Sequence, residues 1–223
     1  MGSTGRRVGR PRAAQRPESG LSAREELLNA AAALFTSYGY AATTTRAIAE
    51  RAGMRQATMY HYVGGKEDLL AELLESTVTP SLALAGRLLA EEDRTAEERL
   101  WELCRSDVEL LCGGAHNLGS LYLLPEVRGD RFAGFRRVRA ELREAYGALL
   151  AATGPGAALG KEELALRTDL VFGLIEGVIL VHRSHAAQAS DGPHAGRTVA
   201  AFAAATADAA LRIAGVAAPP GAP

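Results

Sequence analysis

Residues 45–64 read TRAIAERAGMRQATMYHYVG, a spacing that predicts two short helices joined by a tight turn. Ala49 supplies the small side chain that a second helix needs in order to cross the first closely. Gly53 supplies a turn residue that tolerates a positive φ. The apolar groups expected to face the core between the helices are Ile48, Ala52, Met54, Met59 and Tyr62. This pattern is typical of a helix-turn-helix unit.

The second helix of this unit, expected over residues 55–63, would expose a polar face. Arg55, Gln56, Thr58 and His61 fall on that face. Such side chains read base edges or hold phosphates when the helix lies in a major groove of DNA. The alternative is an αα-hairpin whose polar face is simply solvated, an arrangement common in helical proteins.

The charges are divided unevenly along the 223 residues, although the formal net charge is only −1. Residues 1–70 hold ten basic and six acidic side chains, whereas residues 71–223 hold fifteen and twenty. Residues 1–20 are rich in glycine, arginine and proline without helical periodicity, which predicts a flexible basic arm. A basic end on an acidic body favours contact with a polyanion, while a tail that only aids solubility is the alternative.

Helical signals continue along the whole chain. Ser22 with Glu25, and Thr95 with Glu98, form capping boxes ahead of apolar helical repeats. No stretch combines apolar/polar alternation with β-branched residues, so we expect an all-α fold. The expected helices cover residues 22–38, 45–52, 55–63, 66–77, 95–112, 117–124, 131–152, 161–187 and 194–216, with a boundary at Pro80 and loops at 153–160 and 190–193.

Several classes of protein are disfavoured by the sequence. Cys104 and Cys112 are the two cysteines, and eight residues of helix would separate them by about 12 Å, too far for a disulfide. No apolar stretch predicts a membrane helix or signal peptide, so we expect a cytoplasmic protein without a membrane partner. No catalytic, metal-binding or phosphate-loop motif is present, which predicts a protein that is not an enzyme and has no cofactor.

Residues 43–70, with the preceding LFTSYGY of residues 34–40, closely resemble the N-terminal domain of TetR-type transcriptional regulators. The resemblance implies a helix-turn-helix DNA-binding domain over residues 21–70 and a larger helical ligand-binding and dimerisation domain over residues 71–223. It also implies a homodimeric repressor that binds a palindromic operator in double-stranded DNA and is released by a small-molecule effector of unknown identity. The positions that carry the match are Phe35, Gly39, Thr44, Ile48, Ala49, Gly53, Thr58, Tyr60, Tyr62 and Lys66.

Two positions depart from the family pattern. Arg55 stands where the family usually has a serine or threonine cap, so we expect a weak N-cap on the recognition helix. Val63 replaces the usual phenylalanine, which leaves less aromatic bulk beneath that helix.

Specific contacts to bases and phosphates are expected from four residues. Arg55 and Gln56 begin the recognition helix and are the expected base readers, arginine for guanine and glutamine for adenine. Thr44 would offer its hydroxyl and nearby backbone N–H groups to a phosphate. The resemblance implies that Lys66 holds a phosphate as well.

The two tyrosines of the unit are expected to differ in role. The resemblance implies that Tyr60 hydrogen-bonds the DNA backbone with His61 beside it, the alternative being a core aromatic. Tyr62 is expected to be that core aromatic.

Within the arm, Gly9-Arg10-Pro11 resembles the core of minor-groove AT-hooks. Arg10 and Arg12 would then lie in a narrow minor groove, whose potential favours cations. A nonspecific electrostatic arm is the alternative.

The C-terminal helices predict a dimer interface. Residues 170–181 are apolar nearly all round, as in a helix that is covered on more than one side. Gly173 and Gly177 lie four apart and would permit close approach of a partner helix, or equally of a helix in the same subunit. We expect dimerisation through residues 161–187 and 194–216.

Candidate ligand contacts are polar or aromatic side chains set among apolar ones. For each of them a role in the core, in a loop or in an ion pair is the alternative. They are Trp101, Cys104, Asp107, His116, Asn117, Tyr122 and Glu176. Two other functions stay open: an architectural DNA-binding protein without a ligand, and an all-α enzyme with an incidental helix-turn-helix.

Overall fold

The computed structural model of the protein describes residues 20–187 and 198–217, with side chains of the first range described up to Val181. Every regular element in these ranges is helical, which confirms the all-α expectation. The α-helices are α1 (Ala23–Tyr38), α2 (Thr45–Arg51), α3 (Gln56–Met59), α4 (Lys66–Ala90), α5 (Ala96–Gly113), α6 (Ala133–Ala152), α7 (Gly154–Ala157), α8 (Lys161–Ala187) and α9 (Val199–Ala214). Three 3-10 helices, η1 (Leu118–Leu123), η2 (Pro125–Arg128) and η3 (Asp130–Phe132), lead into α6.

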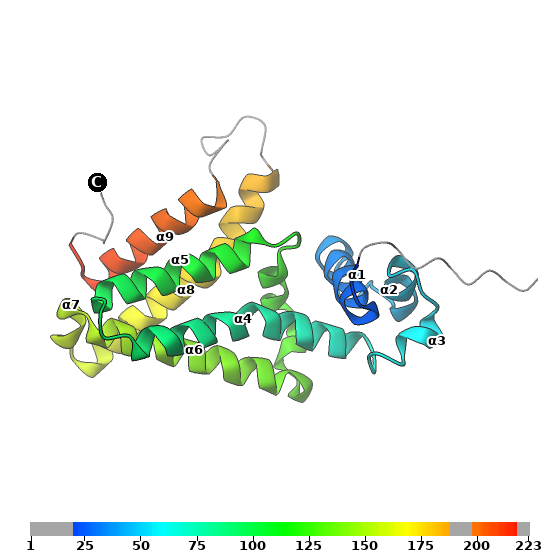
Figure 1. Cartoon of the computed structure of the whole chain (residues 1–223), viewed down its shortest axis with the longest axis horizontal. Coiled ribbons are helices and arrows are strands. Elements are labelled where there is room, and N and C mark those ends of the chain that lie inside the picture. The colour runs from blue at the N-terminus through cyan, green and yellow to red at the C-terminus, as the bar shows by residue number, and fades with distance from the viewer. Residues whose placement is uncertain (1–19, 188–197, 218–223) are drawn as a thin grey trace, which may run out of the picture.

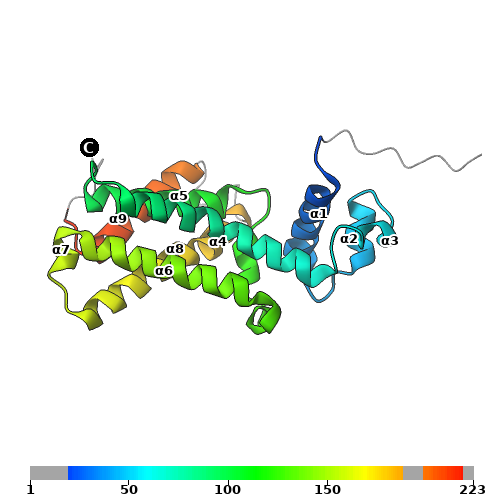
Figure 2. The same cartoon turned by 60° about the horizontal axis from the view of Figure 1, so that its bottom comes forward.

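The molecule is elongated, with a small unit at one end (Figure 1). Helices α1 to α3 form that unit, and α4 runs from it into a body that contains α5 to α9 (Figures 1 and 2). Because α4 is continuous, the boundary expected after Leu70 falls inside a helix. A displacement of α4 in the body can therefore reach the small unit.

The capping boxes form as their sequences predict. The Ser22 hydroxyl accepts from the Glu25 N–H at 3.3 Å, and the Glu25 carboxylate accepts from the Ser22 N–H at 2.7 Å. Thr95 and Glu98 repeat this exchange at the start of α5, at 3.2 and 2.9 Å. These bonds satisfy N–H groups that a helix leaves free at its start.

The helix-turn-helix has a fully buried centre. Ile48, Ala49 and Met59 are 0% exposed, and Phe35 packs its ring 5.1 Å from that of Tyr40. Gly53 has a φ of +69°, the left-handed conformation that its place in the turn predicts. A side chain at this position would be strained by about 1 kcal/mol or more.

The recognition helix is shorter than the sequence predicts. Instead of spanning residues 55–63, α3 is regular over Gln56–Met59 only and continues as turns to Tyr62. Arg55 gives no side-chain cap, which confirms the weak N-cap. Tyr62 is 41% exposed, so its expected role in the core is wrong: in this tightened turn Val63 is the residue that points inward, at 6% exposure.

The expected boundary at Pro80 is also wrong, because α4 continues through it to Ala90. A proline inside a helix costs about 3 kcal/mol. Pro80 is itself exposed, while Val78, Ala85 and Leu88 on the other side of the helix are buried. Packing of this face against the body offsets the lost backbone bond.

The remaining differences are local. Where an α-helix is expected over residues 117–124, the chain forms the 3-10 helix η1 (Leu118–Leu123), and α6 begins at Ala133 instead of 131. The expected loop 153–160 contains the short α7. Residues 190–193 and the start of the last expected helix lie outside the described ranges.

Cys104 and Cys112 form no disulfide with each other, as their separation along the helix predicts, and both are buried. Burial raises the pKa of both thiols, that of Cys112 to about 11. Among the described residues, no helix is both long enough and apolar enough to span a bilayer.

Candidate nucleic-acid interface and ligand cavity

Helix α3 lies at the end of the small unit that is remote from the body (Figure 1). The side chains expected to meet DNA are exposed there, including Tyr60 at 50%. They are Thr44, Arg55, Gln56, Thr58, Tyr60 and His61. Arg10 and Arg12 lie outside the described residues. These side chains form a short row of exposed hydrogen-bond donors and acceptors on the buried core of the helix-turn-helix.

Two of these exposed side chains, Gln56 and Tyr60, form a hydrogen-bonded cluster with the half-buried Thr45. The Gln56 amide donates to the Thr45 hydroxyl at 2.9 Å and to the Tyr60 hydroxyl at 3.5 Å. The Thr45 and Tyr60 hydroxyls lie 3.4 Å apart, and hydrogen bonds from Thr45 and Gln56 lower the pKa of Tyr60. Reading adenine with both amide atoms would redirect at least one of these two bonds, because the amide nitrogen of Gln56 has only two hydrogens.

Thr45 is a member of this cluster that sequence reasoning missed. The i, i+4 spacing of Gln56 and Tyr60 is a sequence signal, whereas the contact with Thr45 depends on how α2 crosses α3. Its neighbour Thr44 is the N-cap of α2, where its hydroxyl accepts from the Ala47 N–H at 3.1 Å.

Lys66 has a structural role in addition to the expected one. Its ammonium donates to the carbonyls of Tyr40 and Thr43, at 3.0 and 3.1 Å, and lies 4.3 Å from the centre of the Tyr40 ring. These bonds tie the turn between α1 and α2 to the start of α4. The phosphate contact of Lys66 stays a prediction.

Charged residues hold the turn that follows α3 at both ends. Arg24 donates to the Tyr62 carbonyl at 2.7 Å and pairs with Glu72. The Gly64 N–H donates to Asp68 at 2.9 Å, and Asp68 pairs with Arg131 of η3. The hydrogen bond from Arg131 is the largest cause of the lowered pKa of Asp68. The position of the recognition helix is thereby coupled to α1, to α4 and to the body.

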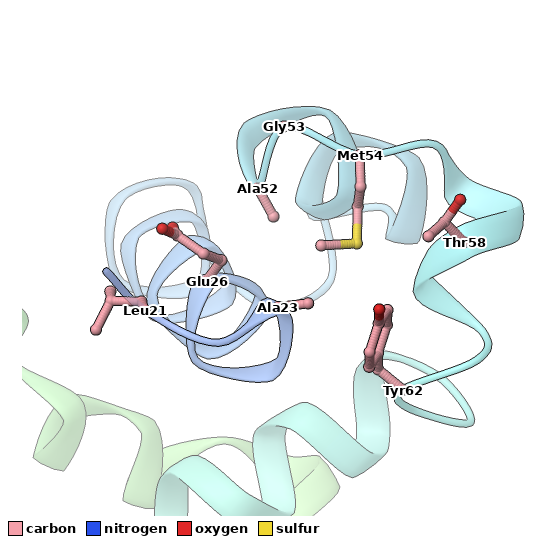
Figure 3. Close-up of a pocket in the computed structure, with 8 residues that line it drawn as sticks. All are labelled: Leu21, Ala23, Glu26, Ala52, Gly53, Met54, Thr58 and Tyr62. Carbon is pink, nitrogen blue, oxygen red and sulfur yellow. The ribbon is translucent and has the colours of Figure 1, made fainter. Parts of the chain in front are cut away.

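A small cavity lies behind the recognition helix, between it and the start of α1 (Figure 3). Met54 and Tyr62 point toward it from one side, and Ala23 from α1 lies opposite. Its volume is about 130 Å³. Sites for small molecules usually enclose about 300–1,000 Å³, so this gap is too small for a typical effector.

The body holds a larger cavity between α6, α8 and the 3-10 segment, which we call the α6–α8 cavity. Its volume is about 460 Å³, within the range of ligand sites. Tyr122 and Glu176 are the candidate ligand residues that line it. The cavity is also lined by Leu124, Val127, Phe135 and Ile179, by Arg128, Arg136 and Arg139, and by Gly177 and Leu180 on the outer side of α8.

Glu176 is ion-paired in this structure. Arg139 of α6 approaches it with two guanidinium nitrogens, the Nε–Oε1 distance being 2.5 Å. The hydrogen bond that Arg139 donates to Glu176 is the largest cause of the raised pKa of Arg139. The Arg139 guanidinium also lies 5.1 Å from the centre of the Phe172 ring.

Four other candidates do not line this cavity. Trp101 donates to Asp208 at 2.8 Å and so links α5 to α9, and Cys104 is 0% exposed. Asn117 donates to the Ile179 carbonyl at 3.0 Å, while its buried amide oxygen has no hydrogen-bond partner among the described residues. His116 lines a separate hollow against α1.

Asp107, the last candidate, belongs to a buried polar network. It accepts from the hydroxyls of Ser81 and Tyr146 at 2.8 and 2.9 Å and is 3% exposed. Burial, which outweighs these two bonds, raises its pKa to about 6. Ser81, Asp107 and Tyr146 lie on α4, α5 and α6, so the network joins three helices of the body.

This network makes stability depend on pH in an unusual direction. The pKa of Asp107 in the folded protein lies above the ordinary aspartate value of 3.8, so the folded state binds the proton more tightly than the unfolded state. Its contribution to the free energy of unfolding should rise by about 2 kcal/mol between about pH 7.5 and about pH 4.5. Urea unfolding of the natural chain and of Asp107→Asn isolates the effect, because paired carboxylates such as Asp68 shift oppositely. A difference between the two proteins that is constant with pH would contradict it.

Several known proteins are similar to this chain in sequence and structure. A family model described as "Bacterial regulatory proteins, tetR family" matches residues 27–73. The crystal structure of Mycobacterium smegmatis AmtR is 44% identical to this chain, covers 90% of each chain and gives a TM-score of 0.75. The chain belongs to the TetR family of transcriptional regulators.

More distant matches agree with this membership of the TetR family. The HTH-type transcriptional repressor KstR2 of Mycobacterium tuberculosis is 47% identical over 53 residues, which are 24% of this chain and 26% of that protein. The match thus spans about a quarter of that relative's length. A TetR-family regulator from Bordetella parapertussis, at 20% identity, shares the fold over 84% of this chain and 93% of its own, with a TM-score of 0.68. These proteins are named as regulators, in agreement with the expectation that the chain is not an enzyme.

Proposed function

We propose that this TetR-family protein is a dimeric transcriptional repressor that binds a palindromic operator and is released by a small molecule. The observation that carries the proposal is α3, whose polar side chains are exposed on a fully buried helix-turn-helix core. A two-fold dimer would place two such helices in successive major grooves, which is why the operator should be palindromic.

The proposed dimer interface is formed by α8 and α9, with the outer face of α8 at its centre. Leu166, Leu170 and Leu180 are each more than half exposed on a helix whose other face packs in the body. Atoms placed as Cβ on Gly173 and Gly177 would meet nothing within 4 Å in the subunit. Packing inside the subunit therefore does not require Gly173, for which approach of a partner helix is the better account, whereas Gly177 also lines the α6–α8 cavity.

Selection of bound sequences from a random DNA pool, followed by footprinting, tests DNA recognition. Enriched sites should contain two inverted half-sites spaced by about one helical turn. A pool without enrichment would favour the architectural alternative. An enzyme with an incidental helix-turn-helix would keep its activity after residues 1–70 are removed.

Base reading by α3 gives a sharper prediction. Arg55→Ala or Gln56→Ala should each weaken binding to the selected operator by about 1–3 kcal/mol and weaken binding to random DNA less. Titrations of both DNAs at one salt concentration measure the difference. Arg46→Ala is a matched control, because Arg46 is exposed on α2 and already pairs with Glu50 at 2.8 Å. Equal losses on both DNAs would make Arg55 and Gln56 phosphate contacts.

A further inference from the structure

We infer that the α6–α8 cavity binds an amphipathic carboxylate, with an apolar chain inside and a single carboxylate held by Arg139. The inference rests on the proposed function, because it names the class of effector that this regulator would take. It depends on three features of the cavity: its charge, the state of Arg139 and the apolar wall.

The charge of the lining is opposite to that of the body. Residues 71–223 carry fifteen basic and twenty acidic side chains. The cavity nevertheless gathers Arg128, Arg136 and Arg139 against one lining carboxylate, Glu176. Beside a low-dielectric wall, an excess of positive charge favours an anion over a neutral or cationic ligand.

Arg139 is already arranged to hold a carboxylate. Glu176 occupies the guanidinium through two nitrogens, the planar geometry that suits arginine and carboxylate. The Arg139 side chain is still 40% exposed, whereas that of Glu176 is 19% exposed. A ligand carboxylate can therefore approach the open side of Arg139 and share it with, or displace, Glu176.

Arg136 has a different role at the same wall. Its guanidinium donates to the carbonyls of Val127 and Gly129, both at 2.7 Å. These bonds fix the 3-10 segment that closes one side of the cavity. Arg136 thus adds positive charge to the cavity while Arg139 is the group placed to pair with a ligand.

The apolar side chains that line the cavity indicate that the rest of the ligand is an apolar chain. Leu124, Val127, Phe135 and Ile179 line the cavity, and the Tyr122 ring lies 5.2 Å from that of Phe135. The Tyr122 hydroxyl bonds Thr77 of α4 at 2.5 Å. An alkyl chain packed against these side chains would contact Tyr122, which is hydrogen-bonded to α4. Helix α4 continues from the body into the DNA-binding unit.

Isothermal titration with three probes that share a ten-carbon chain tests the inference. Decanoate should bind at least about tenfold more tightly than decan-1-ol, because a charge-assisted bidentate pair is worth that much or more. Decyltrimethylammonium should bind most weakly. Each probe is used below its micelle-forming concentration, and thermal unfolding of the same samples gives an independent measure of binding.

Three variants assign the preference to named side chains. Arg139→Met should abolish the preference for decanoate over decan-1-ol, and Glu176→Gln should strengthen decanoate binding severalfold by removing a competing carboxylate. Arg137→Met is the matched control, since Arg137 lies on α6, is 70% exposed in its side chain and pairs with Glu141. If Arg139→Met fails to fold with Glu176 unpaired, the double variant Arg139→Gln/Glu176→Gln keeps a neutral pair and should bind decanoate and decan-1-ol alike.

Equal binding of all three probes, binding of none of them, or a decanoate preference that survives in Arg139→Met and in the double variant would overturn the inference. DNA binding by the same preparations, measured without any probe, is read separately. Loss of DNA recognition would overturn the proposed function and leave the ligand preference standing. A missing ligand preference would leave DNA recognition standing.

Discussion

Gly173→Arg should convert the protein to a monomer and weaken operator binding at least about a hundredfold, equivalent to roughly 3 kcal/mol. The substitution puts a charged side chain in the middle of the proposed α8 interface, where burial without a partner costs several kcal/mol. It should not unfold the subunit, because a Cβ at Gly173 meets no atom within 4 Å and arginine favours helix over glycine. Sedimentation equilibrium and operator titration measure the two effects.

Gly86→Arg is the matched control for this experiment. Gly86 is also an exposed helical glycine with no atom within 4 Å of its Cβ position, but it lies on α4. This variant should stay dimeric and bind the operator like the natural chain. A natural chain that sediments at its monomer mass of 23.4 kDa at micromolar concentration would refute the dimer itself.

Deleting residues 2–17 should weaken operator binding strongly at low salt and flatten its salt dependence by several units per dimer. The segment holds Arg6, Arg7, Arg10, Arg12 and Arg16. Each phosphate neutralised on B-DNA contributes about −0.9 to the slope of log K against log salt, so two arms account for several units. Dimerisation and thermal stability should change little, because the segment lacks apolar periodicity. A slope that is the same after the deletion would mean that the arm does not touch DNA.

A single substitution separates charge from groove reading in the arm. If Gly9-Arg10-Pro11 enters a minor groove, Arg10→Ala should lose more affinity on operators with A·T-rich flanks than with G·C-rich flanks. Arg6→Ala, outside that tripeptide, should lose the same amount on both flanks. Identical losses for Arg10→Ala on both flanks would support a purely electrostatic arm.

Local patterns in the sequence were sufficient wherever neighbours along the chain decide the outcome. The capping boxes at Ser22 and Thr95, the positive φ of Gly53 and the weak cap at Arg55 all depend on residues within four positions. The same patterns placed the helix-turn-helix and the exposed polar face of α3. They failed at Pro80, where burial of a distant face outweighs the local preference to end the helix.

The candidate site residues also fall into two groups, those that residue spacing predicts and those that depend on how helices pack. The exposed polar side chains of α3 were predictable because one face of a short helix follows from residue spacing. Of the seven candidate ligand residues, only Tyr122 and Glu176 line the α6–α8 cavity, because a cavity is defined by which helices pack together. The contacts of Thr45 with Gln56, 11 positions apart across the turn, and of Arg131 with Asp68, 63 positions apart, depend on how helices cross and carry no local signal.

The sequence by itself therefore determined the all-α class, the DNA-binding motif and the polar surface of the recognition helix, since each is encoded within a few helical turns. Only the tertiary structure decided which polar groups are buried in networks, which line a cavity and which glycines face outward. The physical reason is that burial and pairing of side chains depend on the crossing of helices such as α4, α6 and α8. Those crossings are fixed by the packing of the whole body, not by the residues at any single site.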